Sequence, residues 1–209
     1  MSRILLIAAM LLSVVAVVFQ TSDVTSISEL ASGVIRHVAS GTERIISRAE
    51  ASKRTRGGHV INPASLVATH NKWRQQVGVS PLRWSSALAK DAQAWAEVLS
   101  RKSCKMRHAK QQRYGENIFW ASALRWSDGR REVQAISGDS VVDNWGSEVR
   151  DYNYKKNKCR RGRRCGHYTQ LVSRRTQEVG CGMAVCADKG QVWVCRYDPP
   201  GNIVGHRPY

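Results

Sequence analysis

Six cysteines constrain this sequence more than any other feature, because cross-links between them limit the folds that the chain can adopt. All of them lie in the second half of the chain, at Cys104, Cys159, Cys165, Cys181, Cys186 and Cys195. No two are spaced as C-x-x-C, so a zinc-thiolate site is not favoured. An even set favours disulfides in an exported protein, although the spacing alone does not say which cysteines pair.

The amino terminus indicates that the chain is exported. Arg3 precedes an uncharged run over residues 4–19, and small and polar residues follow it. This is the layout of a secretory signal, with an uncleaved membrane anchor as the alternative. We therefore assign residues 1–22 to a signal peptide or anchor. The protein is expected to be secreted or extracellular, or periplasmic if it comes from a Gram-negative bacterium.

The formal net charge is +17, and much of the excess is concentrated around Cys159 and Cys165. Such a loop attracts an anionic polysaccharide or a membrane surface, and a solvated charged loop is the alternative. Nucleic acid is not expected as a partner, because no aromatic side chains accompany the charge at stacking spacing. The residues expected to contact an anionic partner are Arg160, Arg161, Arg163 and Arg164.

A composition change divides the chain after the apolar run. Residues 23–61 are rich in Ser, Thr, Arg and Gly, which predicts a basic linker with the composition of a disordered segment. A domain then occupies residues 62–209. It opens with Asn62 as a helix N-cap and Pro63 at the first helical position, and Gly78 ends this helix.

Two predicted helices carry an ionisable residue inside an apolar stripe. The first stripe reads Leu66, His70, Trp73 and Val77, and the stripe of a helix after Gly138 reads Val141, Trp145, Glu148 and Tyr152. A charge buried there needs a partner. For either residue alone a satisfied polar group in the core is the simpler interpretation, whereas the repetition points equally to a shared site.

The remaining periodicity predicts one more helix and a hairpin. A helix that starts after Ser85 or Ser86 should be buried mainly through Trp95 and Leu99. Strands are predicted over 178–186 and 191–197 with a loop between them, and the stretch from Gly166 to Gly182 reads as the start of this sheet. Helices first and a hairpin last indicate an α+β domain.

Four stretches, HNKWR (70–74), GENI (115–118), GHYTQLV (166–172) and VWVCRYDPPGNIVG (192–205), resemble the CAP superfamily in order and spacing. This superfamily comprises the cysteine-rich secretory, antigen 5 and pathogenesis-related 1 proteins, and the last branch is the most similar. The resemblance covers residues 62–209. It implies a three-layer α-β-α sandwich with a central antiparallel sheet of three strands.

The resemblance also implies a cleft tetrad of two histidines and two glutamates, at His70, Glu116, Glu148 and His167. Two imidazoles with neighbouring carboxylates suit Zn²⁺ or another divalent cation. A zinc-dependent hydrolase or peptidase is the alternative, with Glu116 or Glu148 as general base. A third interpretation is a hydrogen-bonded cluster that only organises the cleft.

Further expectations follow from the same resemblance. It implies disulfides Cys104–Cys186, Cys159–Cys165 and Cys181–Cys195. It implies binding of a sterol or fatty acid, for which the aromatic candidates are Phe119, Trp120 and Trp126.

Ser173 stands where the family usually has Trp, so either a neighbour fills that space or the local strand is looser. The tail over residues 199–209 resembles a segment that is released as a peptide in plant relatives, although packing under the sheet explains the same residues.

Taken together, the sequence predicts an exported binding or effector module more than an enzyme. The alternatives are the hydrolase above and a cationic antimicrobial or cell-wall-binding protein. The sequence predicts no oligomeric state.

Overall fold

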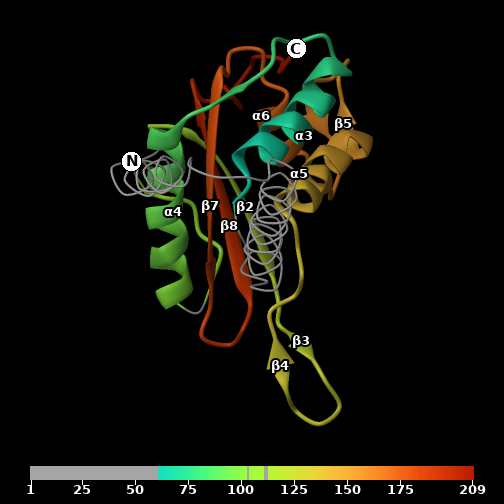
Figure 1. Ribbon diagram of the computed structural model, residues 1–209. Coiled ribbons are helices and arrows are strands. Elements are labelled where there is room, and N and C mark those ends of the chain that lie inside the picture. Colours follow the sequence, from blue (N-terminus) through green and yellow to red (C-terminus); the bar gives the residue numbers. More distant parts are fainter. Residues whose placement is uncertain (1–60, 103, 111–112) are drawn as a thin grey trace, which may run out of the picture. The chain divides into compact units, whose positions relative to one another are not determined.

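The computed structural model describes residues 61–102, 104–110 and 113–209 (Figure 1). The signal peptide or anchor assigned to residues 1–22 and nearly all of the linker lie outside these residues. Within the described ranges, no helix has both the length and the apolar character needed to cross a membrane.

A four-stranded sheet forms the middle of the domain. Its strands lie in the order β1 (Arg83–Trp84), β7 (Glu178–Val185), β8 (Gln191–Asp198) and β2 (Gly115–Ala121). The β7–β8 hairpin matches the predicted one within a residue, and β2 pairs antiparallel with β8. The short strand β1 pairs parallel with β7, so the sheet is mixed rather than purely antiparallel.

Helices cover both faces of this sheet (Figure 1). Helix α4 (Ser86–Arg101) packs on β7 and β8 from one side, and α3 (Pro63–Gln75), α5 (Gly138–Gly146) and α6 (Gly166–Leu171) form the layer on the other. This confirms the predicted α+β sandwich of three layers.

Two glycines of β7 allow α4 to lie close against the sheet. A Cβ at Gly180 would come within 2.2 Å of the Ala89 backbone nitrogen, and one at Gly182 within 2.4 Å of the Gln93 backbone. The helix presents Leu88, Ala92, Ala96 and Leu99 as its buried residues. Trp95 is only half-buried, so the helix is buried mainly through small and aliphatic side chains rather than through Trp95 as predicted.

The first helix follows its sequence signals. The Asn62 side chain accepts a hydrogen bond from the Ser65 amide, Pro63 takes the first helical position, and Gly78 adopts a φ of 69° in the turn after the helix. Asn62 thus satisfies a free amide at the start of the helix, Pro63 needs no donor there, and Gly78 turns the chain after the helix, as predicted.

The helix after Gly138 is shorter than the apolar stripe suggests. The α-helical part α5 ends at Gly146, and Glu148 lies in the 3₁₀ segment η1 (Ser147–Asp151) that follows. A Cβ at residue 146 would come within 2.1 Å of the Trp73 ring, so only glycine lets α3 and α5 cross here. The change of helix type turns Glu148 toward α6.

The stretch beginning with GHYTQL is also a correction to the sequence interpretation. It forms the short helix α6, and the strand β7 begins only at Glu178. Ser173 therefore lies in the turn after α6 instead of in a strand.

Two small hairpins extend from the sandwich. Strands β3 (Leu124–Arg125) and β4 (Arg131–Glu132) form a hairpin that projects beyond the sheet (Figure 1), and β5 (Tyr152–Asn153) pairs with β6 (Lys158–Cys159) beside α6.

The disulfides confirm the pairing implied by the family resemblance. They join Cys104 to Cys186, Cys159 to Cys165, and Cys181 to Cys195. The first ties the segment after α4 to the β7–β8 hairpin, the second closes a small ring in the basic loop, and the third links the two central strands.

Arg74 holds the turn after α6 from within the core. Its guanidinium is completely buried and donates to the carbonyl oxygens of Ser80, Leu171, Ser173 and Thr176 at 2.7 to 3.0 Å. Burial lowers the pKa of Arg74 to about 10, which still leaves it charged at neutral pH. One side chain therefore satisfies four backbone acceptors that have few alternatives.

We predict that Arg74→Met lowers the free energy of unfolding by about 3 kcal/mol or more, because it leaves buried carbonyls unpaired while keeping the volume of the side chain. Denaturant unfolding measures this. Arg175→Met is the matched control, because Arg175 is exposed and a surface change of this kind stays within about 0.5 kcal/mol. Equal stability of the two variants would contradict the role given to Arg74.

Candidate functional site

A cleft of about 430 Å³ opens between the start of β2, the start of α6 and the basic loop. Glu116 and His167 of the predicted tetrad line it, and so does His108, which is not one of the residues predicted from the sequence. The remaining lining residues are Asn117, Cys159, Arg163, Arg164, Cys165, Gly166 and Asn202.

His167 is held by Glu148 at the start of α6. The Nδ1 atom lies 2.7 Å from Glu148 Oε1, while Oε2 accepts from the backbone amides of His167 and Tyr168 at 3.0 and 3.2 Å. Burial alone would raise the pKa of Glu148, but the His167 ring and these amides outweigh it and lower that pKa. The ionised carboxylate thus fixes the ring and satisfies the first amides of α6.

His108 is held in the same way by Glu116. Its Nδ1 contacts Glu116 Oε1, and the hydrogen bond that the ring donates to this carboxylate raises the pKa of His108. Glu116 Oε2 accepts from Arg196 Nη1 at 2.5 Å, and Arg196 Nε donates to Asp91 at 2.7 Å. Because β2 and β8 place Glu116 directly opposite Arg196, the sheet register builds this pair.

His70 is a correction to the predicted tetrad. It is completely buried, with Nδ1 2.8 Å from the Leu66 carbonyl oxygen and Nε2 2.9 Å from the Tyr197 hydroxyl. Burial lowers the pKa of His70 to about 4, so the neutral ring donates through Nδ1 and accepts through Nε2. Both nitrogens are occupied and the residue does not line the cleft. The structure puts His108 in the place predicted for His70.

The two histidines of the cleft share one arrangement. Each has Nδ1 on a carboxylate, and no described residue hydrogen-bonds to either Nε2. An imidazole whose Nδ1–H is held by a carboxylate presents Nε2 as a metal ligand. The carboxylates themselves act as supports here, because Glu116 and Glu148 already accept hydrogen bonds through both oxygens. Among the described residues, no group of three or more His, Cys, Asp or Glu side chains has the geometry of a metal site.

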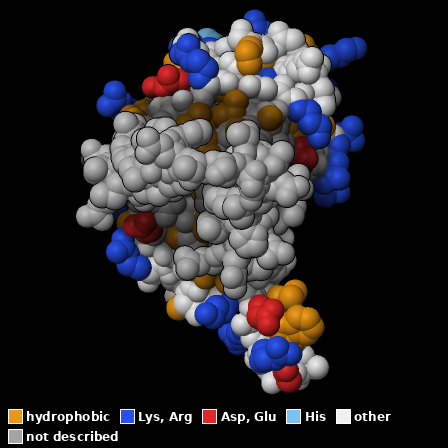
Figure 2. All heavy atoms as spheres, in the orientation of Figure 1, with side chains coloured by type: hydrophobic (Ala, Val, Ile, Leu, Met, Phe, Trp, Pro, Cys, Tyr) orange, Lys and Arg blue, Asp and Glu red, His pale blue; other side chains and the backbone are white. Residues whose placement is uncertain are grey.

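The aromatic candidates for lipid binding do not share one surface. Phe119 packs against the core between the sheet and α3, whereas its neighbour Trp120 alternates to the other face of β2 and is 40% exposed. Trp126 lies in the projecting β3–β4 hairpin under the Arg130 guanidinium. Figure 2 shows apolar and charged side chains gathered on this projecting part. Lipid binding by these residues together stays a prediction that the arrangement does not favour.

The four arginines of the Cys159–Cys165 ring divide between different surroundings. Arg163 and Arg164 line the cleft, and Arg163 also approaches Asp151 at 3.8 Å. Arg160 and Arg161 are exposed and line neither the cleft nor the larger cavity next to it. An anionic partner can therefore meet only two of the four from within the cleft.

The tail packs against the domain. Pro208 is buried and its carbonyl oxygen accepts from the Arg174 amide, while Tyr209 stacks on Tyr154 with ring centroids 4.8 Å apart. These contacts show that Pro208 and Tyr209 pack against the domain, which is the structural alternative given for the tail residues.

We predict that the stability of the protein falls as the pH drops from about 6.5 to 4, by roughly 3 kcal/mol from His70 alone. In the unfolded chain this imidazole takes up a proton near pH 6.5, but in the fold it does so only near pH 4. Protonation therefore favours the unfolded state in this window. Chemical denaturation of His70→Gln should give a flatter pH dependence and lower stability at pH 7, and an unchanged slope would contradict the assignment.

Comparison with known proteins places the chain in a family. The model of the cysteine-rich secretory protein family, CAP, matches residues 67–197, a span that includes both His/Glu pairs. Pathogenesis-related protein PR-1 of Medicago truncatula is 44% identical over 145 residues, covering 69% of this chain and 77% of that protein.

Solved structures show the same fold at lower identity. Venom allergen-like protein 4 of Schistosoma mansoni matches with a TM-score of 0.54 and 24% identity, covering 70% of this chain and 92% of that one. The structure of NaASP2 with Zn²⁺ matches with a TM-score of 0.53 and 23% identity, covering 70% and 84%. Because the family model spans more than half of the chain and the sequence relative agrees with it, this chain belongs to the cysteine-rich secretory protein (CAP) family.

Proposed function

We propose that this chain is an exported binding module whose cleft holds a divalent cation, Zn²⁺ above all, on Nε2 of His108 and Nε2 of His167. The observation that supports this is the repeated arrangement of two imidazoles lining one cleft, each with its Nδ1 on a glutamate carboxyl group. Imidazole nitrogens are preferred ligands of Zn²⁺, and a carboxylate on the second nitrogen raises the basicity of the ligand. The three disulfides fit the oxidising compartment that export implies.

The chemistry of the donor set fits a site with open positions. Two histidines leave coordination places for water or for an anionic group of a partner. Arg163 and Arg164 line the same cleft, and their charge disfavours a bare cation but attracts an anion. The arrangement therefore suits an anionic group held jointly by the cation and the arginines. The fold neighbour NaASP2, solved with Zn²⁺, is consistent with a cation in this family.

Binding is favoured over hydrolysis because neither glutamate is free to act as a base. Glu116 is buried, accepts from His108 and the Ala109 amide on one oxygen, and accepts from Arg196 on the other. Glu148 accepts three hydrogen bonds from the start of α6 and the His167 ring. A general base needs an accessible oxygen within reach of the water that it deprotonates.

We predict that calorimetric titration with Zn²⁺ gives one site, and that His108→Ala and His167→Ala each abolish it or weaken it by far more than tenfold. Glu148→Gln should weaken binding by about 10- to 100-fold, because the His167 ring loses the carboxylate that orients it. His206→Ala is the matched control, since His206 is exposed in the tail and should change nothing.

The pH dependence of this titration gives a second readout. Because Glu116 raises the pKa of His108, protons compete with the cation for this ring. The affinity should fall as the pH drops from about 8 to 6, and binding should release protons. If His108→Ala and His206→Ala bound Zn²⁺ equally well, the proposed site would be wrong.

A further inference from the structure

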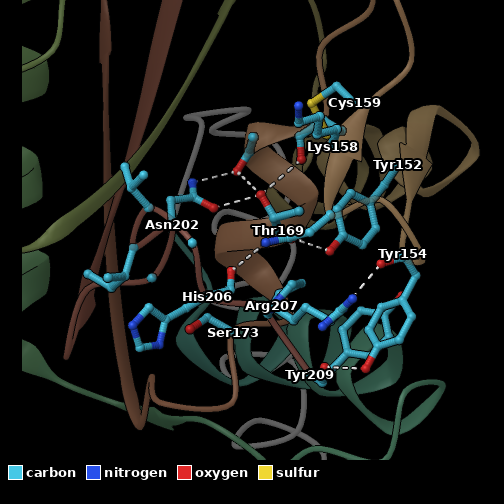
Figure 3. Close-up of a pocket in the computed structure, with 18 of the residues that line it drawn as sticks. Tyr152, Tyr154, Lys158, Cys159, Thr169, Ser173, Asn202, His206, Arg207 and Tyr209 are labelled. Carbon is cyan, nitrogen blue, oxygen red and sulfur yellow. Dashed lines mark hydrogen bonds between the residues drawn. A yellow bond between two sulfur atoms is a disulfide. The ribbon is translucent and has the colours of Figure 1, made fainter.

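A second and larger cavity, of about 1050 Å³, lies next to the cleft (Figure 3). Its walls are the β5–β6 hairpin, the outer side of α6, the turn after α6 and the tail over residues 201–209. Figure 3 shows Asn202 and Thr169 on one side and the rings of Tyr154 and Tyr209 on another. Neither the proposed cation nor its two histidines are needed to form this cavity.

The cavity is lined by cations and by no carboxylate side chain. Residues 152–177 and 199–209, which supply its whole lining, contain no Asp or Glu. The lining cations are Lys156, Lys158, Arg174, Arg175 and Arg207. Arg207 is tied to the carbonyl oxygens of Tyr154 and Lys155, whereas the other four form no ion pair with a described residue. The cavity therefore favours a ligand with several negative charges.

The uncharged part of the lining favours a ligand that also carries hydroxyl groups. Asn202 and Thr169 are joined at 2.6 Å and Asn157 donates to the His206 carbonyl oxygen, so amides and hydroxyls surround the cavity. Such groups both donate and accept, as sugar hydroxyls require. The ring of Tyr154 is stacked on Tyr209 and has the Arg207 guanidinium over it, which disfavours stacking of a nucleic-acid base there.

Ser173 is a small residue in the lining of this cavity. It is buried at the turn after α6, against Gly201, and lines the cavity. The family resemblance predicts a Trp at this position, whose side chain exceeds that of Ser by a whole indole. A Trp side chain at this lining position would take up room that the small Ser173 side chain leaves to the cavity.

We propose that this cavity binds an anionic oligosaccharide, a chain of sugars bearing carboxylate or sulfate groups. Lys156, Lys158, Arg174 and Arg175 bind the anionic groups, and the amides and hydroxyls bind the sugar hydroxyls. A concave site with polar walls accepts a single narrow chain, whereas a bilayer surface needs a flat or protruding contact. The site and its ligand are independent of the cation proposed for the cleft.

The first test is calorimetry with tetragalacturonate in the presence of a chelator, so that failure of the cation site does not affect it. We expect Lys158→Ser/Arg174→Ser/Arg175→Ser to weaken binding about tenfold or more, because three ion pairs to the ligand are lost. The matched control is Arg101→Ser/Lys102→Ser/Lys105→Ser, which removes the same charge at the far end of α4 near the β7–β8 turn. Equal loss in both triple variants would mean that only net charge matters and would overturn the proposal.

The second test fills the cavity. Ser173→Trp should abolish binding of tetragalacturonate with an unchanged circular dichroism spectrum, while Ser173→Ala should retain it. Full affinity in a folded Ser173→Trp protein would overturn the proposed location. If Ser173→Trp does not fold, the two triple variants decide the question alone.

Two further ligands separate the chemical alternatives. Cellotetraose, a neutral sugar of the same length, should not bind measurably, and affinity equal to that of tetragalacturonate would contradict recognition of charge. Vesicles of phosphatidylserine and phosphatidylcholine test the membrane alternative. Binding of these vesicles that depends on Lys158, Arg174 and Arg175, without binding of tetragalacturonate, would assign the cations to a membrane surface and overturn the proposal.

Discussion

The guanidinium of Arg74 is the interaction on which both cavities depend. It joins α3 to the turn after α6 through the carbonyl oxygens of Leu171, Ser173 and Thr176. This turn sets where α6 ends and where β7 begins. His167 lies at the start of the same short helix, and Ser173 at its end. A charged group in the core is costly unless its donors are used, and here backbone acceptors use four of the five.

A chain of buried hydrogen bonds extends from this region to the cleft. His70 accepts from the Tyr197 hydroxyl, this hydroxyl accepts from Asn117, and Asn117 also donates to the His167 carbonyl oxygen. Three elements, α3, β8 and β2, thereby fix the backbone of a cleft residue. The HNKWR segment thus supplies structural residues, His70 and Arg74, rather than ligands. Because a partly satisfied network in a medium of low dielectric is costly, these polar residues hold one arrangement of the core.

Much of the fold could be predicted from local pattern, because capping residues and apolar periodicity act within a few residues of one another. Asn62, Pro63 and Gly78 bound the first helix as predicted, and the β7–β8 hairpin follows from its alternation and loop. The end of α5 could not be predicted in this way, since it depends on the Trp73 ring crossing at Gly146. The helical form of GHYTQL likewise depends on Glu148 accepting from its first amides, which no local pattern shows.

The candidate site was predictable only in part, for a similar reason. Periodicity marks a buried polar residue such as His70, but it does not distinguish a hydrogen-bonded core histidine from a cleft ligand. His108 lies outside any helix or strand, among lysines and arginines, where no period marks it. Its one signal is a position eight residues before Glu116. The β2–β8 register places Glu116 opposite Arg196, which donates to one carboxylate oxygen. Only this three-dimensional arrangement shows that the other oxygen is available to His108.

The positions of the cations relate the two cavities to each other. The cleft and the larger cavity share Cys159, Cys165, Gly166 and Asn202, so the small disulfide ring is a common wall. Arg163 and Arg164 lie on the cleft side, whereas Lys156 and Lys158 lie on the other. An acidic chain longer than the larger cavity would reach the arginines on the far side of this wall. An acidic chain that occupied both cavities at once would bind more tightly without any new kind of contact, because its second contact would be made within the complex that the first has formed.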